Sequence, residues 1–169
     1  MHEKIIILDF GSQYTQLIAR RVREVEVYCE ILPYNKIPEI TSDIKAIILS
    51  GSPFSVREEN ALHIELDKVI GKVPILGICY GAQYIAQYCG GKVERSSKRE
   101  YGKAELRVKK DSESFFNDMM PSSQIWMSHG DSIIEVPDHF EIIATTDSIP
   151  VAAFKSEVDA YEKPVYGIQ

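Results

Sequence analysis

Short apolar runs alternate with helix-like patterns through the first 91 residues, and this alternation constrains the fold more than any other feature. Continuous apolar runs are typical of strands buried on both faces of a parallel sheet. They occur at residues 5–8, 46–49 and 73–78, and Val27, Cys29 and Ile31 form a further, alternating run. The alternation predicts an α/β fold with a doubly wound, mostly parallel, flavodoxin-like sheet and helices on both faces. Ligands should then bind at the carboxyl ends of the strands.

Three helices are expected between these strands. Apolar residues recur at helical spacing in residues 14–25, where Ser12 is the expected N-cap, in residues 62–70 before Gly71, and in residues 82–89 before Gly90. On this pattern Cys29 and Cys89 face the core. Beyond residue 91 the apolar runs become shorter, at 104–108, 125–127, 142–145, 151–154 and 165–168. We expect these to add antiparallel strands to a single domain of residues 1–169, because no linker separates them.

Composition excludes several partners. The chain of 169 residues carries a formal net charge of −6, which disfavours nucleic acid and anionic membranes. No apolar run approaches the ~20 residues that span a bilayer, and no export signal is recognisable. Three cysteines in such a chain indicate reduced thiols, so we expect a cytoplasmic location. The cysteines show no metal-ligand spacing and no dinucleotide or phosphate-loop signature is present, so we expect no metal and no cofactor in this domain.

The stretch Gly77-Ile78-Cys79-Tyr80-Gly81 lies between an expected strand and an expected helix. A GxCxG turn in this position is typical of a nucleophile elbow, in which glycines allow the strand and helix to approach closely. The turn places the Cys79 thiol at a helix N-terminus, where the helix dipole favours thiolate. Cys79 is therefore expected to attack carbonyl groups. The backbone N–H of Tyr80 and the loop Gly51-Ser52-Pro53 could stabilise the oxyanion.

A base for this thiol is harder to find. His2, His63 and His139 have the pattern of surface residues, and we expect His63 on the polar side of a helix. His129, within Trp126-Met127-Ser128-His129-Gly130-Asp131, is the local candidate. Its Gly and Asp neighbours suit a substrate-contacting loop at least as well as a base.

Four stretches together resemble the class I (triad-type) glutamine amidotransferases over the whole chain. They are the elbow with Gln83 two residues beyond it, Leu8-Asp9-Phe10-Gly11-Ser12-Gln13-Tyr14-Thr15-Gln16, Leu49-Ser50-Gly51-Ser52-Pro53, and the stretch from Trp126 to Asp131. The resemblance is strongest to the branch whose ammonia an ATP-dependent domain uses to convert XMP to GMP. It implies the fold of that family and a glutaminase activity.

The resemblance also implies roles for individual residues. Cys79 would attack the side-chain amide of glutamine to give a glutamyl thioester and ammonia. Tyr80 and Ser52 would supply oxyanion-hole N–H groups. The glutamine would be surrounded by Gly51, Gln83, Ser128, His129, Gly130 and Asp131.

Two features depart from the pattern of the family. Ser52 stands where the family often has a second glycine, which a role for its backbone N–H tolerates. In the family a His-Pro-Glu stretch supplies the base and its orienting acid just after a strand like Tyr166-Gly167-Ile168-Gln169, where the sequence ends. We therefore expect a truncated glutaminase domain that is nearly inactive alone, with the synthase domain, its ATP and Mg²⁺ and any homodimer contact lying elsewhere.

Other readings stay open at this point. The chain could belong to another amidotransferase of the same fold, such as the anthranilate or CTP synthase type, in which the acceptor is chorismate or UTP. It could also be a catalytically silent module that docks a partner. The expected partners are glutamine and the synthase domain of the same protein.

Overall fold

The structure is a computed structural model that describes residues 2–109, 115–117 and 119–169. The side chains of residues 97–101 and 128–129 lie outside the described part. Its strands are β1 (Lys4–Asp9), β2 (Cys29–Pro33), β3 (Ile44–Leu49), β4 (Ile75–Ile78), β5 (Lys92–Val108), β6 (Ser122–Glu135), β7 (Phe140–Thr145), β8 (Ala153–Ser156) and β9 (Val165–Ile168). Its helices are α1 (Thr15–Glu24), α2 (Tyr80–Tyr88) and the short 3₁₀ helix η1 (Leu66–Lys68).

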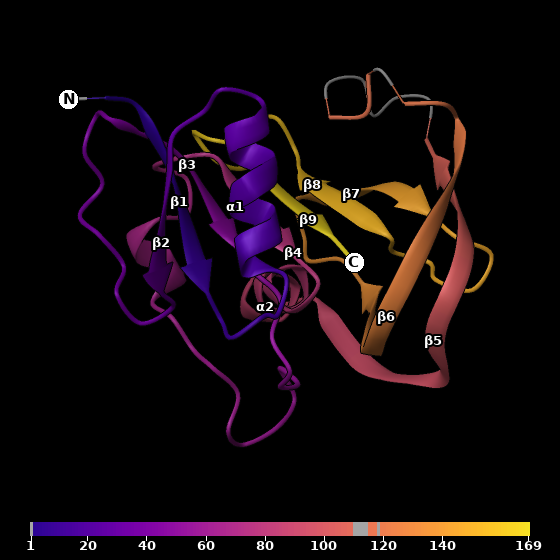
Figure 1. Ribbon diagram of the computed structural model, residues 1–169. Helices are drawn as coiled ribbons and strands as arrows, with labels where there is room; N and C mark the ends of the chain where they lie inside the picture. Colours follow the sequence, from indigo (N-terminus) through magenta and orange to yellow (C-terminus); the bar gives the residue numbers. More distant parts are fainter. Residues whose placement is uncertain (1, 110–114, 118) are drawn as a thin grey trace.

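One mixed sheet contains all of these strands, in the order β2-β1-β3-β4-β9-β8-β7-β5-β6 (Figure 1). The strands β2, β1, β3, β4 and β9 pair in parallel. This part confirms the predicted doubly wound, flavodoxin-like arrangement. The chain adds β2 on one side of β1 and β3 on the other, so a topological switch point lies beside the carboxyl ends of β1 and β3, where ligands of such sheets bind.

The two α-helices cover opposite faces of the parallel strands. Ile7 of β1 is fully buried in a cluster with Ala19 of α1, whereas Ile6 and Leu8 are buried in a cluster with Ile85 of α2. Alternate residues of one strand point to opposite faces, so this division follows directly from the unbroken apolar run in β1. Cys29 is buried and Cys89 packs against the larger cluster, as expected for core residues.

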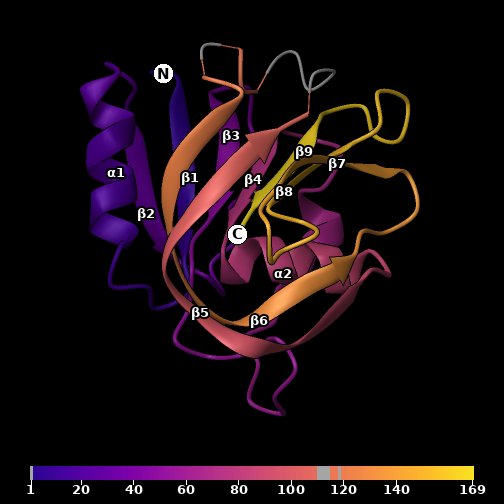
Figure 2. The same cartoon turned by 90° about the vertical axis from the view of Figure 1, so that its right-hand side faces the viewer.

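The antiparallel strands extend the sheet beyond β9. The runs expected at 104–108 and 125–127 belong to much longer strands, which form one curved hairpin of β5 and β6 (Figure 2). Only Arg107 and Val108 of β5 pair with β7, so most of the hairpin leaves the main sheet. Near its base the hairpin lies beside α2, where Glu135 approaches Gly91. The hairpin thereby brings the Gly130-Asp131 part of β6 close to the elbow.

Two helix predictions were wrong in part. Residues 62–70 form no α-helix: the stretch before η1 is extended, because tyrosine side chains of α2 hydrogen-bond its backbone, as described below. Ser12 is not the N-cap of α1, since the helix begins at Thr15 and its N-cap is Tyr14. The Ser12 hydroxyl instead accepts the Tyr14 N–H at 3.0 Å and shapes the turn before the helix. None of the helices in the described residues is long and apolar enough to cross a membrane.

Candidate active site

The elbow joins β4 to α2 through Cys79. Its φ of 50° and ψ of −108° fall in a region that non-glycine residues rarely adopt, so the turn holds the nucleophile in a strained backbone conformation. Both flanking glycines are required by close contacts. A Cβ on Gly77 would lie 2.6 Å from the Ala82 nitrogen, and one on Gly81 would lie 2.5 Å from the Leu49 carbonyl oxygen. The sequence-based prediction of the elbow geometry is confirmed.

Hydrogen bonds fix the Cys79 backbone on both sides. Its N–H donates to the Ile168 carbonyl at 2.8 Å, and its carbonyl accepts the Gln83 N–H at 3.0 Å. Burial raises the pKa of the Cys79 thiol above its ordinary value. Desolvation therefore opposes the helix dipole that was expected to favour thiolate, and the thiol needs a base to become a nucleophile at neutral pH.

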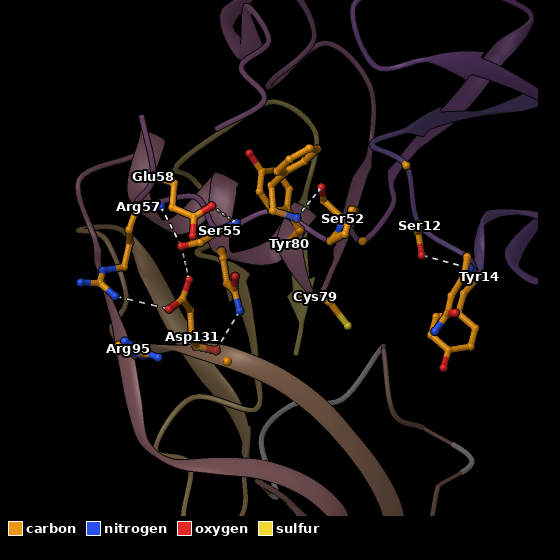
Figure 3. Close-up of a pocket in the computed structure, with 17 residues that line it drawn as sticks. Ser12, Tyr14, Ser52, Ser55, Arg57, Glu58, Cys79, Tyr80, Arg95 and Asp131 are labelled. Atoms are coloured by element: carbon orange, nitrogen blue, oxygen red, sulfur yellow. Dashed lines mark hydrogen bonds and ion pairs between the residues drawn. The ribbon is translucent and has the colours of Figure 1, made fainter. Parts of the chain in front are cut away.

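A cavity of about 900 Å³ opens in front of the thiol (Figure 3). Figure 3 shows Cys79 pointing into it, with the loop from Ser12 to Tyr14 on one side and Asp131 on the other. The lining comes from the loops after β1 and β3, the elbow, and the β5–β6 hairpin. The lining residues are Gly11, Ser12, Gln13, Tyr14, Gly51, Ser52, Pro53, Phe54, Ser55, Arg57, Glu58, Cys79, Tyr80, Gln83, Arg95, Gly130 and Asp131.

Two backbone N–H groups next to the thiol have no acceptor in the part of the chain that the structure describes: those of Ser52 and Tyr80. Gly51 lies directly against the nucleophile, because a Cβ built on it would be 3.8 Å from the Cys79 Cβ. The loop is tied to α2 at its start, where Gly81 N–H donates to the Ser50 carbonyl at 3.2 Å. Unpaired donors at a helix N-terminus can stabilise a developing oxyanion.

Asp131 and Gln83 line the cavity, but both also hold its walls together. The Asp131 carboxylate accepts a hydrogen bond from the Ser55 hydroxyl and forms an ion pair with Arg57 at 3.4 Å. The amide nitrogen of Gln83 donates to the Asp131 carbonyl at 2.9 Å and to the Gln169 side-chain oxygen at 3.3 Å. These contacts join α2, β6, the loop after β3 and the residue after β9.

The remaining predicted residues of β6 are placed in part. Gly130 lines the cavity. The backbones of Ser128 and His129 pair with β5, opposite Tyr101 and Glu100, but their side chains lie outside the described residues. His63 is exposed, as expected of a surface residue, although it lies on extended chain rather than on a helix. Among the described side chains, no histidine lines the cavity.

Several cavity residues were not singled out from the sequence. Ser12, Gln13 and Tyr14 follow β1, and their position at the carboxyl end of a parallel strand was the signal that could have identified them. Arg57 and Arg95 bring positive charge to the cavity, and Glu58 brings negative charge. These side chains come from a loop without secondary structure and from a hairpin whose length the sequence did not reveal.

A comparison with known families matches residues 6–169 to the class-I glutamine amidotransferases. Curated relatives named GMP synthase [glutamine-hydrolyzing] include one from Cytophaga hutchinsonii, 60% identical over 92% of this chain, and one from Phocaeicola vulgatus, 53% identical over the whole chain. The matched parts make up 30% and 32% of these two relatives, so the chain spans about a third of their length.

Solved structures show the same fold. A chain from Thermoplasma acidophilum, assigned to GMP synthase, aligns with a TM-score of 0.81 and 31% identity, covering all of this chain and 83% of that one. A glutamine amidotransferase from Thermotoga maritima aligns with a TM-score of 0.75 at 21% identity, covering all of this chain and 75% of that one, which supports the fold alone.

Proposed function

Because this chain belongs to the class-I glutamine amidotransferase family, we propose that it binds glutamine in the cavity at Cys79 and releases the side-chain nitrogen as ammonia. One observation carries the proposal: the Cys79 thiol faces a cavity between two backbone N–H groups that have no acceptor among the described residues. This is the arrangement that attack on a carbonyl requires.

In the proposed reaction the Cys79 thiolate forms a bond to the amide carbon of glutamine. The negative charge that develops on the amide oxygen is stabilised by the N–H groups of Ser52 and Tyr80. The C–N bond then breaks, the nitrogen takes a proton and leaves as ammonia, and a glutamyl thioester stays on Cys79. Water hydrolyses this thioester to glutamate and restores the thiol.

The polar ends of the substrate are proposed to lie toward β6, against Gln83, Gly130 and Asp131, with Ser128 and His129 next along the strand and Gly51 beside the thiol. Charge supports this direction. Arg57, Arg95 and Glu58 put both signs of charge on the cavity wall, which suits the α-carboxylate and α-ammonium groups of an amino acid.

The base and its orienting acid are proposed to come from a His-Pro-Glu stretch that follows Gln169 in the longer protein. The position of β9 supports this proposal. Because Cys79 N–H donates to the Ile168 carbonyl, residues just after β9 would lie beside the nucleophile. Residues 1–169 would then form the glutaminase domain without its complete triad.

The names of the relatives support a further step. We propose that the ammonia passes to an ATP- and Mg²⁺-dependent synthase domain of the same protein, which converts XMP to GMP. The test is glutamine hydrolysis by the natural full-length protein, measured with and without XMP and ATP. Stimulation by XMP is expected, whereas stimulation by UTP or chorismate would assign the chain to another branch of the family.

The thiol chemistry can be tested on residues 1–169 directly. The chain is exposed to 6-diazo-5-oxo-norleucine, a glutamine analogue whose ketone accepts a thiolate, and the adduct is mapped by mass spectrometry. We expect one adduct, on Cys79, and its loss in Cys79→Ser. An adduct on Cys29 or Cys89 with Cys79 unmodified contradicts the proposal, as does protection of Cys79 by glutamate and glutamine that is no greater than by leucine.

A further inference from the structure

The extended stretch of residues 61–65 is held by side chains of α2 rather than by a neighbouring strand. It belongs to no strand of the sheet. The Tyr80 hydroxyl donates to the Leu62 carbonyl at 2.9 Å and accepts the Leu62 N–H at 2.8 Å. The Tyr84 hydroxyl donates to the Ile64 carbonyl at 2.6 Å and accepts the Ile64 N–H at 3.0 Å. Each phenol therefore replaces one residue of a missing partner strand.

The spacing of the two tyrosines matches the spacing of their partners. Residues four apart on a helix are separated by about 6.0 Å along its axis. Residues two apart on an extended chain are separated by about 6.6 Å. Tyr80 and Tyr84 therefore present their hydroxyls at nearly the repeat of Leu62 and Ile64, and their rings lie almost parallel, with centroids 6.4 Å apart and planes at 10°. A slip by one residue would leave these buried hydroxyls without their partners.

This stretch is the far end of the loop that lines the active site. The loop begins at Ser50, which is tied to α2 by Gly81, and its middle is tied to β6 through Ser55 and Asp131. Tyr84 fixes its end. Three separate contacts thus set the loop against the helix that carries the nucleophile, and only the contact at Tyr84 lies away from the cavity.

We propose that Tyr84 is a positioning residue of the glutaminase reaction: by pairing with Ile64 it holds the loop of residues 51–65 in register with α2, so that the N–H groups of Ser52 and Tyr80 face one oxyanion. This inference rests on the proposed function. Tyr84 is 4% exposed and does not line the cavity, so it acts only through the loop. Burial raises the pKa of Tyr84, which keeps its hydroxyl protonated as a donor at neutral pH.

The test compares two reagents on Cys79 in the natural full-length protein. Reaction with 6-diazo-5-oxo-norleucine passes through a tetrahedral oxyanion and uses the two N–H groups, whereas displacement of iodide from iodoacetamide does not. Rates are measured on the Cys79 peptide by mass spectrometry. The variant is Tyr84→Phe, which keeps the ring and removes the hydroxyl. The matched control is Tyr88→Phe on the same helix, whose hydroxyl bonds the exposed Asp67 at 2.8 Å.

A positioning role predicts that Tyr84→Phe slows the reaction with the glutamine analogue by about tenfold and leaves the iodoacetamide rate within twofold, because misdirecting one oxyanion donor costs less than removing it. Tyr88→Phe should leave both rates within twofold. Equal changes in both rates for Tyr84→Phe, or no change in either, overturn the inference while the proposed function stands. Failure of the unaltered protein to react with the glutamine analogue overturns both.

Hydrogen exchange of the unaltered protein gives a second test that does not depend on a variant. The N–H groups of Leu62 and Ile64 are bonded to phenols, whereas those of His63 and Glu65 have no acceptor in the described residues. We expect alternating protection, with Leu62 and Ile64 exchanging at least about tenfold more slowly. Uniform exchange across residues 62–65 overturns the inference, since the phenols would then not hold the loop.

Discussion

The close approach of β4 and α2 at the elbow makes Gly77→Ala the sharpest test of the fold. An added Cβ would lie 2.6 Å from the Ala82 nitrogen and 2.6 Å from the Gly81 carbonyl carbon. Ordinary van der Waals contact begins near 3.4 Å, so the helix must move by about 3.4 − 2.6 = 0.8 Å. No positive φ is involved at Gly77, and the effect is therefore steric.

The size of the effect follows from these contacts. Overpacking costs about 1–3 kcal/mol, and the upper end applies because the obstructing atoms are backbone rather than a flexible side chain. Replacing glycine returns about 0.5–1 kcal/mol by restricting the unfolded chain. The net loss should be about 2 kcal/mol. With a urea m-value of about 2 kcal/mol/M, the unfolding midpoint should fall by about 1 M.

Urea unfolding of residues 1–169, followed by far-UV circular dichroism, measures this loss. Gly130→Ala is the matched control, because Gly130 also lies in a strand but a Cβ there meets nothing within 4 Å. The control should be unchanged or slightly stabilised. A midpoint for Gly77→Ala within about 0.2 M of the Gly130→Ala midpoint would refute the claim that the glycine is required by close packing.

Three further predictions concern charge and protonation. The iodoacetamide rate of Cys79 should rise with pH through a midpoint above the ordinary thiol pKa of about 8.5, because burial raises that pKa; a midpoint below about 8 contradicts it. Burial raises the pKa of Tyr80 to about 12, so its neutral form stabilises the fold fully below pH ~10, and this contribution should be lost as pH rises toward 12, which phenolate absorbance and urea unfolding at pH 9 and 11 can measure. Arg57→Ala should lower the free energy of unfolding by less than about 1 kcal/mol because Arg57 is partly exposed, whereas Asp131→Ala should lower it by about 1–3 kcal/mol by leaving Ser55 without its acceptor; equal losses in urea unfolding contradict this difference.

The parallel part of the fold was predictable because its signals are local. The runs at β1, β3 and β4 are unbroken and apolar, as strands covered on both faces require. The stretch after residue 61 shows where such signals fail. Leu62 and Leu66 have helical spacing, but Tyr80 and Tyr84, distant in sequence, supply hydrogen bonds that an extended chain accepts. Tertiary contacts decided that conformation.

The same division applies to the site. Cys79 could be identified from the sequence because the glycines around it dictate a turn that few structures use. Arg57 and Arg95 could not, since neither follows a strand or belongs to a recognisable motif. Asp131 was anticipated as a substrate contact, and that role stays a prediction. Its ion pair with Arg57 depends on how the hairpin curves back to the loop after β3.

The position of β9 has a consequence for how the protein folds. This last strand lies in the interior of the sheet, between β4 and β8, and its Ile168 accepts the hydrogen bond from Cys79. During synthesis the elbow sequence emerges about ninety residues before its partner, so the sheet cannot close early. Such a pairing distance raises the contact order and slows folding. The reactive cysteine therefore reaches its strained, activated backbone only once nearly the whole domain has been made.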